Sequence, residues 1–559
     1  MASDPTMKAP RSGVRIRMYR LGHGDCFLLA FPGQEGSARP PVHVLIDCGY
    51  KPGSQVPDPK TGEDIRIDAI VDDIVAATGG KVDVVIVTHE HQDHVNGFGT
   101  TRDRVPIFDR LDEIGEVWLA WTEDGNDSLA NRLRRDYHDQ LIGLAFAEER
   151  LGMAGADPEQ VQLVSELLEL ELGGEEDSLA PGQAAAMIRE RFRESLDKNR
   201  AMAMSGHTSF AVEGITNKNA IAYLRGRATG GVRFLSPGGA PVALPRGVKA
   251  LAYPLGPPRN EQLLTDLDPR EQEAFHMRPP FAMDGAAQTF FAAAAAQSGA
   301  GEMTGSPFAT RYRHAAETVF ATERPEYADD ALREASGAVG KLEFMRGVYG
   351  PKDPDEDPTD GAPWRRIDAD WLDASEALAL RLNDEVNNTS LVLAFELPDT
   401  RQVLLFTGDA QRGSWFSWAD LEWQTADGTV DARDLLGRCT FYKCGHHGSH
   451  NATMNGTEQD SWANIDWLGR GRFAEDFVAM IPANTAWARG KKRPWDHPLP
   501  AIEEELRRKA RGRVFRTDVD HVDLDDLPED TEPLSNAEKN AFKKASAEEA
   551  LYLEFTVYD

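Results

Sequence analysis

The sequence predicts an α/β fold, on three observations. Apolar runs of strand length alternate with segments of helical periodicity, histidines and aspartates follow several of these runs, and two long stretches of different texture interrupt the alternation. A chain of 559 residues exceeds one ordinary domain. We therefore expect one large elaborated domain or two to three smaller ones.

The first elements follow from local patterns. Residues 13–31 alternate in polarity and turn at two glycines, which predicts two strands joined as a hairpin. Residues 42–49 predict a third strand, and residues 67–81 predict an amphipathic helix stopped by two glycines. The apolar run that begins at Val82 is expected to be a buried strand leading into a loop.

Later apolar runs predict a strand hairpin over 387–410, a strand that opens 439–453, a strand over 476–484, a helix over 499–511 and a strand over 512–518. The expected segments are a first core part 12–102, a helical insertion 103–205, core strands 206–256, a second insertion 257–383, a second core part 384–525, and an acidic tail with a final strand 526–559.

Composition narrows the class of protein. Hydrophobic residues make up 41% of the chain, which is enough for a sizeable core. The 61 Lys and Arg against 92 Asp and Glu give a net charge of −31. This balance argues against nonspecific nucleic-acid binding over the whole surface, although it allows a local basic groove.

The four cysteines, Cys26, Cys48, Cys439 and Cys444, form no CxxC pair. They indicate reduced thiols rather than a disulfide framework or a zinc ribbon. We find no signal-peptide pattern and no run of about 18 apolar residues. The expected location is therefore cytoplasmic, with no membrane association.

The stretch "HEHQDH" carries the most specific signal. It places His89, His91, Asp93 and His94 directly after a predicted strand. Alternate side chains of such a loop can point the same way, so His89 and His91 could share one ion while Asp93 and His94 turn toward a second. Imidazole and carboxylate ligands of this kind suit Zn²⁺. A solvated polar loop does not explain three of the chain's 14 histidines in six positions.

Two later segments supply ligands of the same kind. The run "VLLFTG" ends in Asp409, a carboxylate that could bridge two ions, and "YKCGHHGSH" supplies His446 and His447 after another strand. Three strand ends thus bring histidine and aspartate to one edge of the core. Two ions about 3.5–4 Å apart would generate a hydroxide nucleophile near neutral pH and clamp a phosphoryl group. We expect two divalent ions as cofactors, Zn²⁺ first and Mn²⁺ second.

The order of "LGHGDCFLL", "VLIDCG", "THEHQDHVNG", "NNTSLVL", "LLFTGDA", "KCGHHGSH" and "WDHP" resembles that of the metallo-β-lactamase fold. Within this fold it is most similar to the ComEC-like branch, named for the hydrolase domain of the DNA-uptake channel ComEC. The resemblance implies an αββα sandwich. It covers the core strands and leaves the two large, mostly helical insertions unmatched.

The resemblance also implies roles for the metal-seeking residues. His89 and His91 would ligate one metal, and Asp93 and His94 the other, with Asp409 bridging the two ions. Asp93 is thereby expected to take part in catalysis.

One histidine of the 446/447 pair would complete the second metal site. His447 directly precedes the glycine, as the family's ligand does, so His446 would be free to meet a substrate oxygen or donate a proton. Asp47, at the end of a predicted strand, resembles the family's aspartate that orients the ligands. A turn carboxylate before Gly49 is the alternative for Asp47.

The first metal site departs from the wider superfamily, which places a further histidine before the bridging aspartate. Here the matching stretch offers Asn388, as in the ComEC-like branch, and its amide oxygen is a weaker, harder ligand than imidazole. This leaves Zn²⁺ and Mn²⁺ both open. His207 in "MSGHTSFAV" competes for the same role, although it could equally be an ordinary loop histidine.

Residues 488–497 combine positive charge with a late histidine. His497 resembles the branch's histidine near the mouth of the site and could bind a phosphate or protonate the leaving group, although a helix-capping role is as plausible. Lys491, Lys492 and Arg493 could form a local positive rim that attracts a phosphodiester. A solvated charged loop is the alternative.

The function expected from the residues and the resemblance is metal-dependent hydrolysis by a metal-bridging hydroxide. The substrate would be nucleic acid or a nucleotide, which makes the chain a phosphodiesterase or nuclease. Hydrolysis of another ester, a lactam or a thioester is one alternative. A partner-binding sensor module with a structural or weakly active metal site is another, in which the insertions would bind a protein partner or form a homo-oligomer.

Overall fold

The computed structural model describes residues 5–34, 40–99, 106–137, 164–165, 168, 216–270, 273, 375–425, 428–455, 464–491 and 495–559. The chain divides into two compact units, and both large sheets belong to the first, which comprises Met1–His138, Ser165–Pro280 and Arg381–Asp559. The second unit comprises Asp139–Val164 and Phe281–Leu380. Most of the predicted insertions, together with His207, Lys492 and Arg493, lies outside the described residues.

The first sheet has eight strands in the order β16-β17-β1-β2-β3-β4-β5-β6. Neighbours are antiparallel from β16 to β3 and parallel from β3 to β6. The strands are β1 (Gly13–Tyr19), β2 (Cys26–Phe31), β3 (Val42–Cys48), β4 (Lys81–Ile86), β5 (Glu113–Ala120), β6 (Ala228–Leu235), β16 (Ser546–Glu548) and β17 (Tyr552–Tyr558).

The second sheet has seven strands in the order β15-β14-β13-β10-β9-β8-β7. Strands β10, β13, β14 and β15 are parallel to one another, and the remaining pairs are antiparallel. The strands are β7 (Val242–Ala243), β8 (Leu251–Gly256), β9 (Val392–Glu396), β10 (Val403–Phe406), β13 (Cys439–Lys443), β14 (Val478–Ile481) and β15 (Val514–Arg516). A separate ribbon joins β11 (Glu422–Thr425) and β12 (Gly428–Asp431).

The helices are α1 (Ile67–Thr78), α2 (Gln92–Val95), α6 (Thr216–Arg227), α7 (Glu261–Leu264), α12 (Ser375–Asn387), α13 (Arg412–Ser417), α14 (Ala432–Gly437), α15 (Thr485–Arg489), α16 (Pro500–Lys509) and α17 (Asn536–Ala545). Short 3-10 helices are η1 (Asn96–Phe98), η2 (Ile107–Arg110), η3 (Trp121–Glu123), η7 (Trp418–Asp420), η8 (Gly445–Gly448), η9 (Ile465–Trp467) and η10 (Gly471–Ala474).

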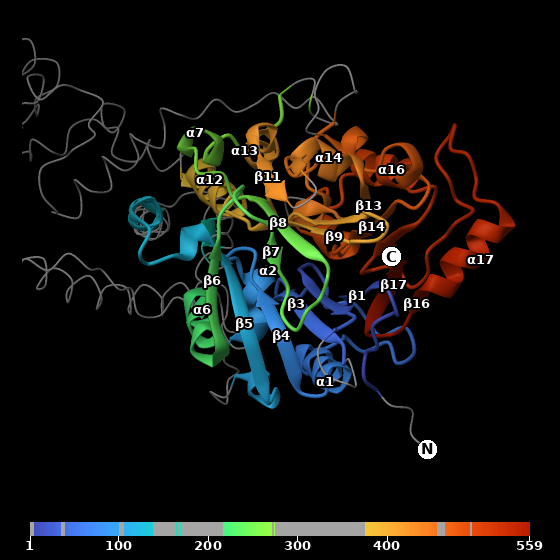
Figure 1. Ribbon diagram of the computed structural model, residues 1–559, viewed down its shortest axis with the longest axis horizontal. Coiled ribbons are helices and arrows are strands. Elements are labelled where there is room, and N and C mark those ends of the chain that lie inside the picture. Colours follow the sequence, from blue (N-terminus) through green and yellow to red (C-terminus); the bar gives the residue numbers. More distant parts are fainter. Residues whose placement is uncertain are drawn as a thin grey trace, which may run out of the picture. The chain divides into compact units, whose positions relative to one another are not determined.

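The two sheets pack face to face, with helices on their outer faces (Figure 1). Strand β2 illustrates why both faces of the first sheet are covered. All six of its residues are buried, and alternate side chains point to opposite faces of the sheet. Phe27 points to the second sheet and meets Phe406 edge-on, with ring centroids 5.7 Å apart. Leu28 points the other way, into a second apolar layer that contains Ile70 of α1 and Leu224 of α6.

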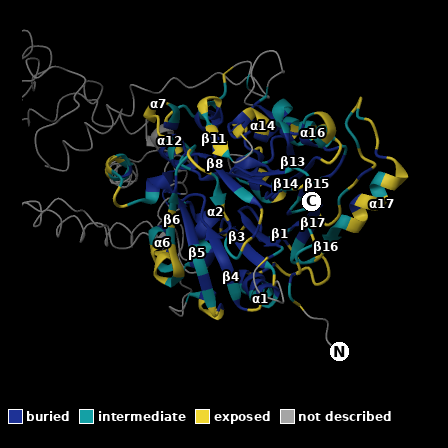
Figure 2. Cartoon of the chain, in the orientation of Figure 1, coloured by how far each residue is buried: buried dark blue, intermediate teal, exposed yellow. Residues whose placement is uncertain are grey.

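A third apolar layer covers the outer face of the second sheet. Leu405 of β10 and Tyr442 of β13 pack there with Trp415 of α13, Leu435 of α14 and Leu506 of α16. Figure 2 shows the strands of both sheets largely buried, with exposed residues on the outward sides of helices such as α6 and α17. The layering is therefore helix, sheet, sheet, helix, which confirms the predicted α/β class.

Several predicted elements are confirmed by the structure. The hairpin is β1 and β2, the third strand is β3, and the predicted helix is α1. That helix ends because Gly79 adopts a left-handed conformation with φ 63°, which a glycine reaches without steric cost. The hairpin over 387–410 is β9 and β10, and the strand expected before the histidines is β13.

The sequence boundaries differ from the structure in two places. The range 103–205 was expected to be a helical insertion, but it contains β5, which pairs with β4 on one side and β6 on the other. Its first half is polar and only partly buried, so it carries no continuous apolar signal. The range 526–559 was expected to be an acidic tail with a final strand. It forms α17, with a capping box at Ser535 and Glu538, and β17, which lies inside the first sheet between β16 and β1.

All four cysteines are buried and unbridged, in agreement with the expected reduced thiols. In the part of the chain that the structure describes, no helix combines the length and the apolar character needed to cross a membrane.

The packing of β17 predicts that its inward residues stabilise the fold. Leu553 is 1% exposed and belongs to the layer between the sheets, whereas Tyr558 is 59% exposed. Leu553→Ala should lower the free energy of unfolding by about 2–5 kcal/mol, measured by denaturant titration. Tyr558→Ala should change it by less than about 0.5 kcal/mol. Equal effects of the two variants would contradict the placement of β17 in the core.

Candidate metal centre

The candidate centre lies where several strands end. Strands β3 and β4 are parallel, as are β10 and β13, so polar residues after each strand meet at one edge of the sandwich. The turn between β1 and β2 reaches the same edge, because Cys26 pairs with Cys48 at the end of β3. The backbone N–H of Asp25 donates to the carbonyl oxygen of Asp93 at 3.0 Å, which joins this turn to the histidine loop.

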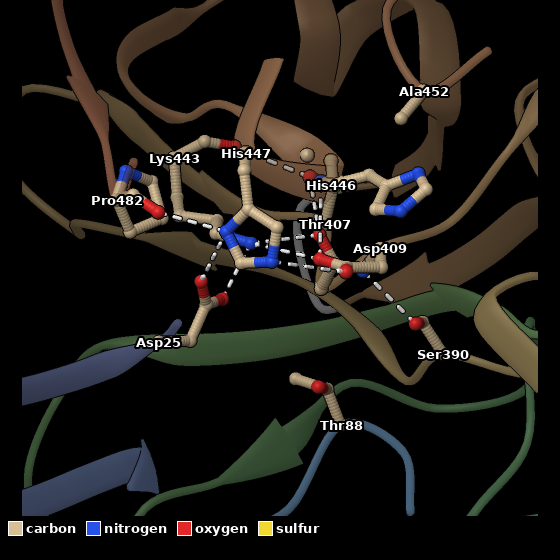
Figure 3. A network of polar contacts seen from close by, with 12 residues as sticks. Asp25, Thr88, Ser390, Thr407, Asp409, Lys443, His446, His447, Ala452 and Pro482 are labelled. Carbon is tan, nitrogen blue, oxygen red and sulfur yellow. Dashed lines mark hydrogen bonds and ion pairs between the residues drawn. The ribbon is translucent and has the colours of Figure 1, made fainter. Parts of the chain in front are cut away.

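Four side chains converge at this edge. Asp25, His94, Asp409 and His447 are all buried, and one ligand atom from each lies within 4.8 Å of the others. His94 Nε2 is 3.2 Å from Asp409 Oδ2, and His447 Nε2 is 3.7 Å from the same oxygen. Figure 3 shows Asp25, Asp409 and Lys443 around the His447 ring. Ligands of one tetrahedral Zn²⁺ are separated by about 3.4 Å, so this group could hold a metal ion.

Unsatisfied polar atoms support a cation at this position. Asp25 Oδ1 and Asp93 Oδ1 are buried without a hydrogen-bond partner, and His94 Nε2 makes no hydrogen bond although it lies 3.2 Å from Asp409 Oδ2. A buried polar atom left unpaired is costly, and charged groups cost most. The donor set of two imidazoles with aspartate oxygens matches the ligands that zinc prefers. The residues present therefore fit a metal ion, as the sequence predicted.

Asp93 adjoins this group of four. Its Oδ2 lies 3.0 Å from His447 Nε2 and 3.4 Å from the Lys51 ammonium. Burial by itself raises the pKa of Asp93, but Lys51 and the contact with His447 hold that pKa well below its usual value. Asp93 was predicted to share an ion with His94. The structure places its carboxylate against His447, next to the cluster.

His89 and His91 form a pair beside His94. His89 Nε2 lies 3.0 Å from His91 Nδ1, and the His89 ring centroid is 4.1 Å from that of His94. Burial, followed by the neighbouring His94 and His91, lowers the pKa of His89 well below its usual value. Two facing ring nitrogens at this distance can share either a proton or a cation. The structure thus brings the predicted first-site pair together, at the edge of the cluster.

Asp47 holds the His94 ring. Its Oδ2 is 2.8 Å from His94 Nδ1, and Thr88 donates to the same carboxyl group from its backbone nitrogen at 2.8 Å and its hydroxyl at 2.6 Å. Asp47 adopts a φ of 54°, which is uncommon for a residue other than glycine. Burial lowers the pKa of an imidazole, yet the facing carboxylates raise that of His94 well above its usual value. Asp47 therefore lies where a ligand-orienting aspartate was predicted, with His94 Nε2 left toward Asp409.

Sequence reasoning missed two charged residues that form an ion pair with each other at the centre. Asp25 is one, and its signal was a carboxylate in a glycine turn opposite the end of β3. Lys443 is the other, a charged residue ending the apolar strand "CTFYK". Its buried ammonium contacts the Asp25 carboxylate, lies 3.3 Å from Asp409 Oδ1 and donates to the Gly408 carbonyl oxygen at 2.8 Å. Burial opposes its charge, but Asp25 and Asp409 raise its pKa.

His446 and His447 have different surroundings. The His447 ring belongs to the cluster and its Nδ1 donates to the Pro482 carbonyl oxygen at 2.7 Å. His446 Nδ1 lies 3.2 Å from the amide oxygen of Asn451. The amide orientation is fixed because the Asn451 amino group donates to Asp384. Nδ1 must therefore carry the proton, which leaves Nε2 as an acceptor. Burial lowers the pKa of His446 to about 3, so the ring is neutral at pH 7.

The asparagine at this centre is not the predicted one. Asn388 donates to the carbonyl oxygens of Leu263 and Leu264, both at 2.9 Å. Its own oxygen accepts from the backbone nitrogens of Gln411 and Ser414 at 3.1 and 3.2 Å. Because both lone pairs and both amide hydrogens are used, Asn388 is a structural residue rather than a metal ligand.

The preceding residue, Asn387, reaches the centre instead. Its Nδ2 lies 3.3 Å from His446 Nε2, and its buried Oδ1 has no hydrogen-bond partner.

His497 lies at the partly exposed side of the centre. The backbone N–H of Asn484 donates to His23 Nδ1 at 3.3 Å, so His23 Nε2 carries the proton and donates to His497 Nδ1 at 3.2 Å. Neutral His497 therefore keeps its own proton on Nε2. Loss of solvent around the ring, followed by His446 and His447, lowers the pKa of His497 well below its usual value. Of the predicted basic rim, Lys491 is described, and its ammonium lies 4.2 Å from the centroid of the Trp487 ring.

No protein-family model matches this chain, and a search of curated proteins also found no match.

The ligand set predicts that metal binding depends on Asp25. The Asp25→Asn variant should bind Zn²⁺ about tenfold more weakly than the wild type. The affinity would be measured by isothermal titration calorimetry after a chelator has removed bound metal. Removing the metal from the wild-type chain should lower its Tm, because a ligand that binds only the folded state stabilises it. The matched control is Asp384→Asn, which alters a partly buried carboxyl group outside the cluster. This variant should bind Zn²⁺ as tightly as the wild type does. Unchanged affinity in Asp25→Asn would remove Asp25 from the ligand set.

Asp384 also predicts a pH dependence of stability. Burial, followed by the charge of Asp268, raises the pKa of Asp384 to about 6. The folded state then holds this proton more tightly than the unfolded state, so the stability it contributes is present at low pH and is lost as the pH rises toward 6. Asp384→Asn should raise the free energy of unfolding by roughly 1–3 kcal/mol at pH 8 and by much less at pH 4.

The measurement is denaturant unfolding of both proteins across this range. The exposed Asp420→Asn serves as the control and should show no such pH-dependent gain. A gain from Asp384→Asn that does not change with pH would contradict the assignment.

Proposed function

We propose that this chain is a metal-dependent hydrolase of phosphodiesters, with nucleic acids or nucleotides as its substrate class. The proposal includes membership of the metallo-β-lactamase fold, in the ComEC-like branch. The observation that carries it is the buried group of Asp25, His94, Asp409 and His447 at one edge of the sandwich, in which Asp25 Oδ1 has no hydrogen-bond partner. Such a site is costly without a cation, and structural packing alone gives no reason for it.

The expected metal is Zn²⁺. Asn388 had suggested a hard amide ligand and thus Mn²⁺, but its amide is fully engaged with backbone groups. The imidazoles that remain favour zinc. The group of four would hold one ion, and the His89–His91 pair beside it would hold the second. Bound there, zinc would lower the pKa of water and withdraw charge from a phosphoryl oxygen.

The surrounding side chains are suited to the remaining steps. His446 keeps its proton on Nδ1 and its Nε2 faces the Asn387 amide nitrogen, which leaves Asn387 Oδ1 to accept a hydrogen bond from a water molecule. His497 keeps a proton on Nε2 and can donate a hydrogen bond to a phosphate or a leaving oxygen. Lys51 and Lys491 provide positive charge near the centre of an otherwise acidic chain, which favours an anionic substrate over a neutral ester.

Hydrolysis of bis-p-nitrophenyl phosphate and of labelled single- and double-stranded DNA and RNA tests the proposal. Each substrate would be assayed with Zn²⁺, Mn²⁺ or Mg²⁺. The Asp93→Ala/His94→Ala double variant should lose activity by on the order of 100-fold or more, because it removes a ligand and the carboxylate next to it. Tyr558→Ala, on the exposed end of β17, should retain wild-type activity.

Parallel assays with a lactam and a thioester would detect the other chemistries open to such a centre. A folded, metal-loaded chain that cleaves no phosphodiester would refute the proposal and favour a sensor or a narrow non-phosphate hydrolase.

A further inference from the structure

A row of aromatic rings leads from the candidate centre to two partly exposed tryptophans. The His23 ring centroid lies 4.2 Å from that of His447, 5.1 Å from that of Trp487 and 6.4 Å from that of Trp495. His497 stacks on His23, with an angle of 9° between the rings, and its centroid is 5.6 Å from that of Trp495. Both tryptophans are therefore only two ring contacts away from a proposed metal ligand.

Lysines cover the same two indole rings. The Lys51 ammonium lies 4.7 Å from the Trp495 centroid, and Lys491 lies 4.2 Å from that of Trp487 and 5.6 Å from that of Trp495. Lys51 also contacts Asp93 of the centre. Aromatic faces next to cations are the combination that binds bases and backbone of an unpaired strand.

The position of the tryptophans is fixed by backbone contacts. Asn484 caps α15, where its side-chain oxygen accepts from the Trp487 backbone N–H at 3.1 Å and its amino group donates to the Ser54 carbonyl oxygen at 2.8 Å. The backbone N–H of Trp495 donates to the carbonyl oxygen of Ala488 at 3.0 Å. The indole planes meet at 80°, with centroids 5.5 Å apart. A surface ordered in this way loses little entropy when a ligand stacks on it.

We propose that Trp487 and Trp495 form a stacking platform for a base adjoining the cleaved phosphodiester, so that the preferred substrate is single-stranded nucleic acid. This inference rests on the proposed function and adds the strand state to it. Base faces are already stacked inside a duplex, and only an unpaired strand can place one against an indole. Stacking tolerates any base, so the platform gives a preference for unpaired strands without a sequence preference.

The test compares two fluorescein-labelled oligonucleotides of equal length, a thymidine oligomer and its counterpart with abasic tetrahydrofuran sites. Both carry the same phosphates, so the difference between them reports base contacts alone. Cleavage would be measured with metal, and binding would be measured by anisotropy in chelator for the full chain. The variants are Trp487→Ala, Trp495→Ala and the corresponding Phe substitutions.

Trp467→Ala is the matched control. Trp467 is also partly exposed, and the guanidinium carbon of Arg470 lies 4.4 Å from the centroid of its ring. Trp467 is the last residue of η9, and the nearby Gly469 packs on Cys439 at the start of β13. This is the opposite end of β13 from the histidines that follow the strand.

The wild type should prefer the base-bearing oligomer by on the order of tenfold or more. Each Ala variant should lose most of this preference, while the Phe variants and Trp467→Ala should keep it. Retention of the preference in both Ala variants would overturn the platform, even if cleavage upholds the hydrolase. If nothing is cleaved, the proposed function fails, and the binding comparison still decides whether the tryptophans recognise bases.

Discussion

The arrangement of this edge of the protein depends on balancing buried charge. Four aspartates, at positions 25, 47, 93 and 409, lie at this edge together with two lysines, Lys51 and Lys443. When all are ionised, the lysines leave an excess of two negative charges in a region from which water is largely excluded. Such an excess is unfavourable unless it is compensated. A divalent cation would balance it, and in its absence the proton drawn to His94 by the facing carboxylates supplies part of the compensation.

The sandwich is what makes this balance possible. Asp47 and Lys443 belong to strands β3 and β13, and Asp25 directly precedes β2, so the apolar layers that cover these strands fix the positions of the three residues. Lys443 illustrates the point, because β13 carries it between β10 and β14, where its ammonium reaches carboxylates from both sheets. The His94 ring then donates a hydrogen bond to Asp47 and the His447 ring donates one to the Pro482 carbonyl oxygen, and these bonds fix the orientation of both imidazoles of the cluster.

Sequence reasoning recovered the elements and residues whose signals are local. Dense histidine and aspartate motifs after apolar runs located the edge of the sandwich, and glycines marked where α1 ends. It failed where the signal is a contact between distant segments. Asp25 belongs to the centre only because β2 pairs with β3, and a carboxylate in a glycine turn does not by itself indicate that pairing. Whether Asn387 or Asn388 reaches the centre depends on the direction in which the chain leaves α12. The sequence around these two asparagines does not determine that direction. Strand β5 was missed because half of it is polar.

The pairing of β1 with β17 has a consequence for how the chain reaches its folded state on the ribosome. Gly13 lies opposite Tyr558, so β1 can pair with β17 only after more than five hundred further residues have been synthesised. Until then β1 keeps an unpaired edge, and the apolar face that Leu553 covers stays open to solvent. The β1–β2 turn that carries Asp25 belongs to the part of the sheet that stays incomplete until β17 has been made. Assembly of the centre is therefore expected to come late in synthesis, and interrupted chains would expose an edge prone to aggregation.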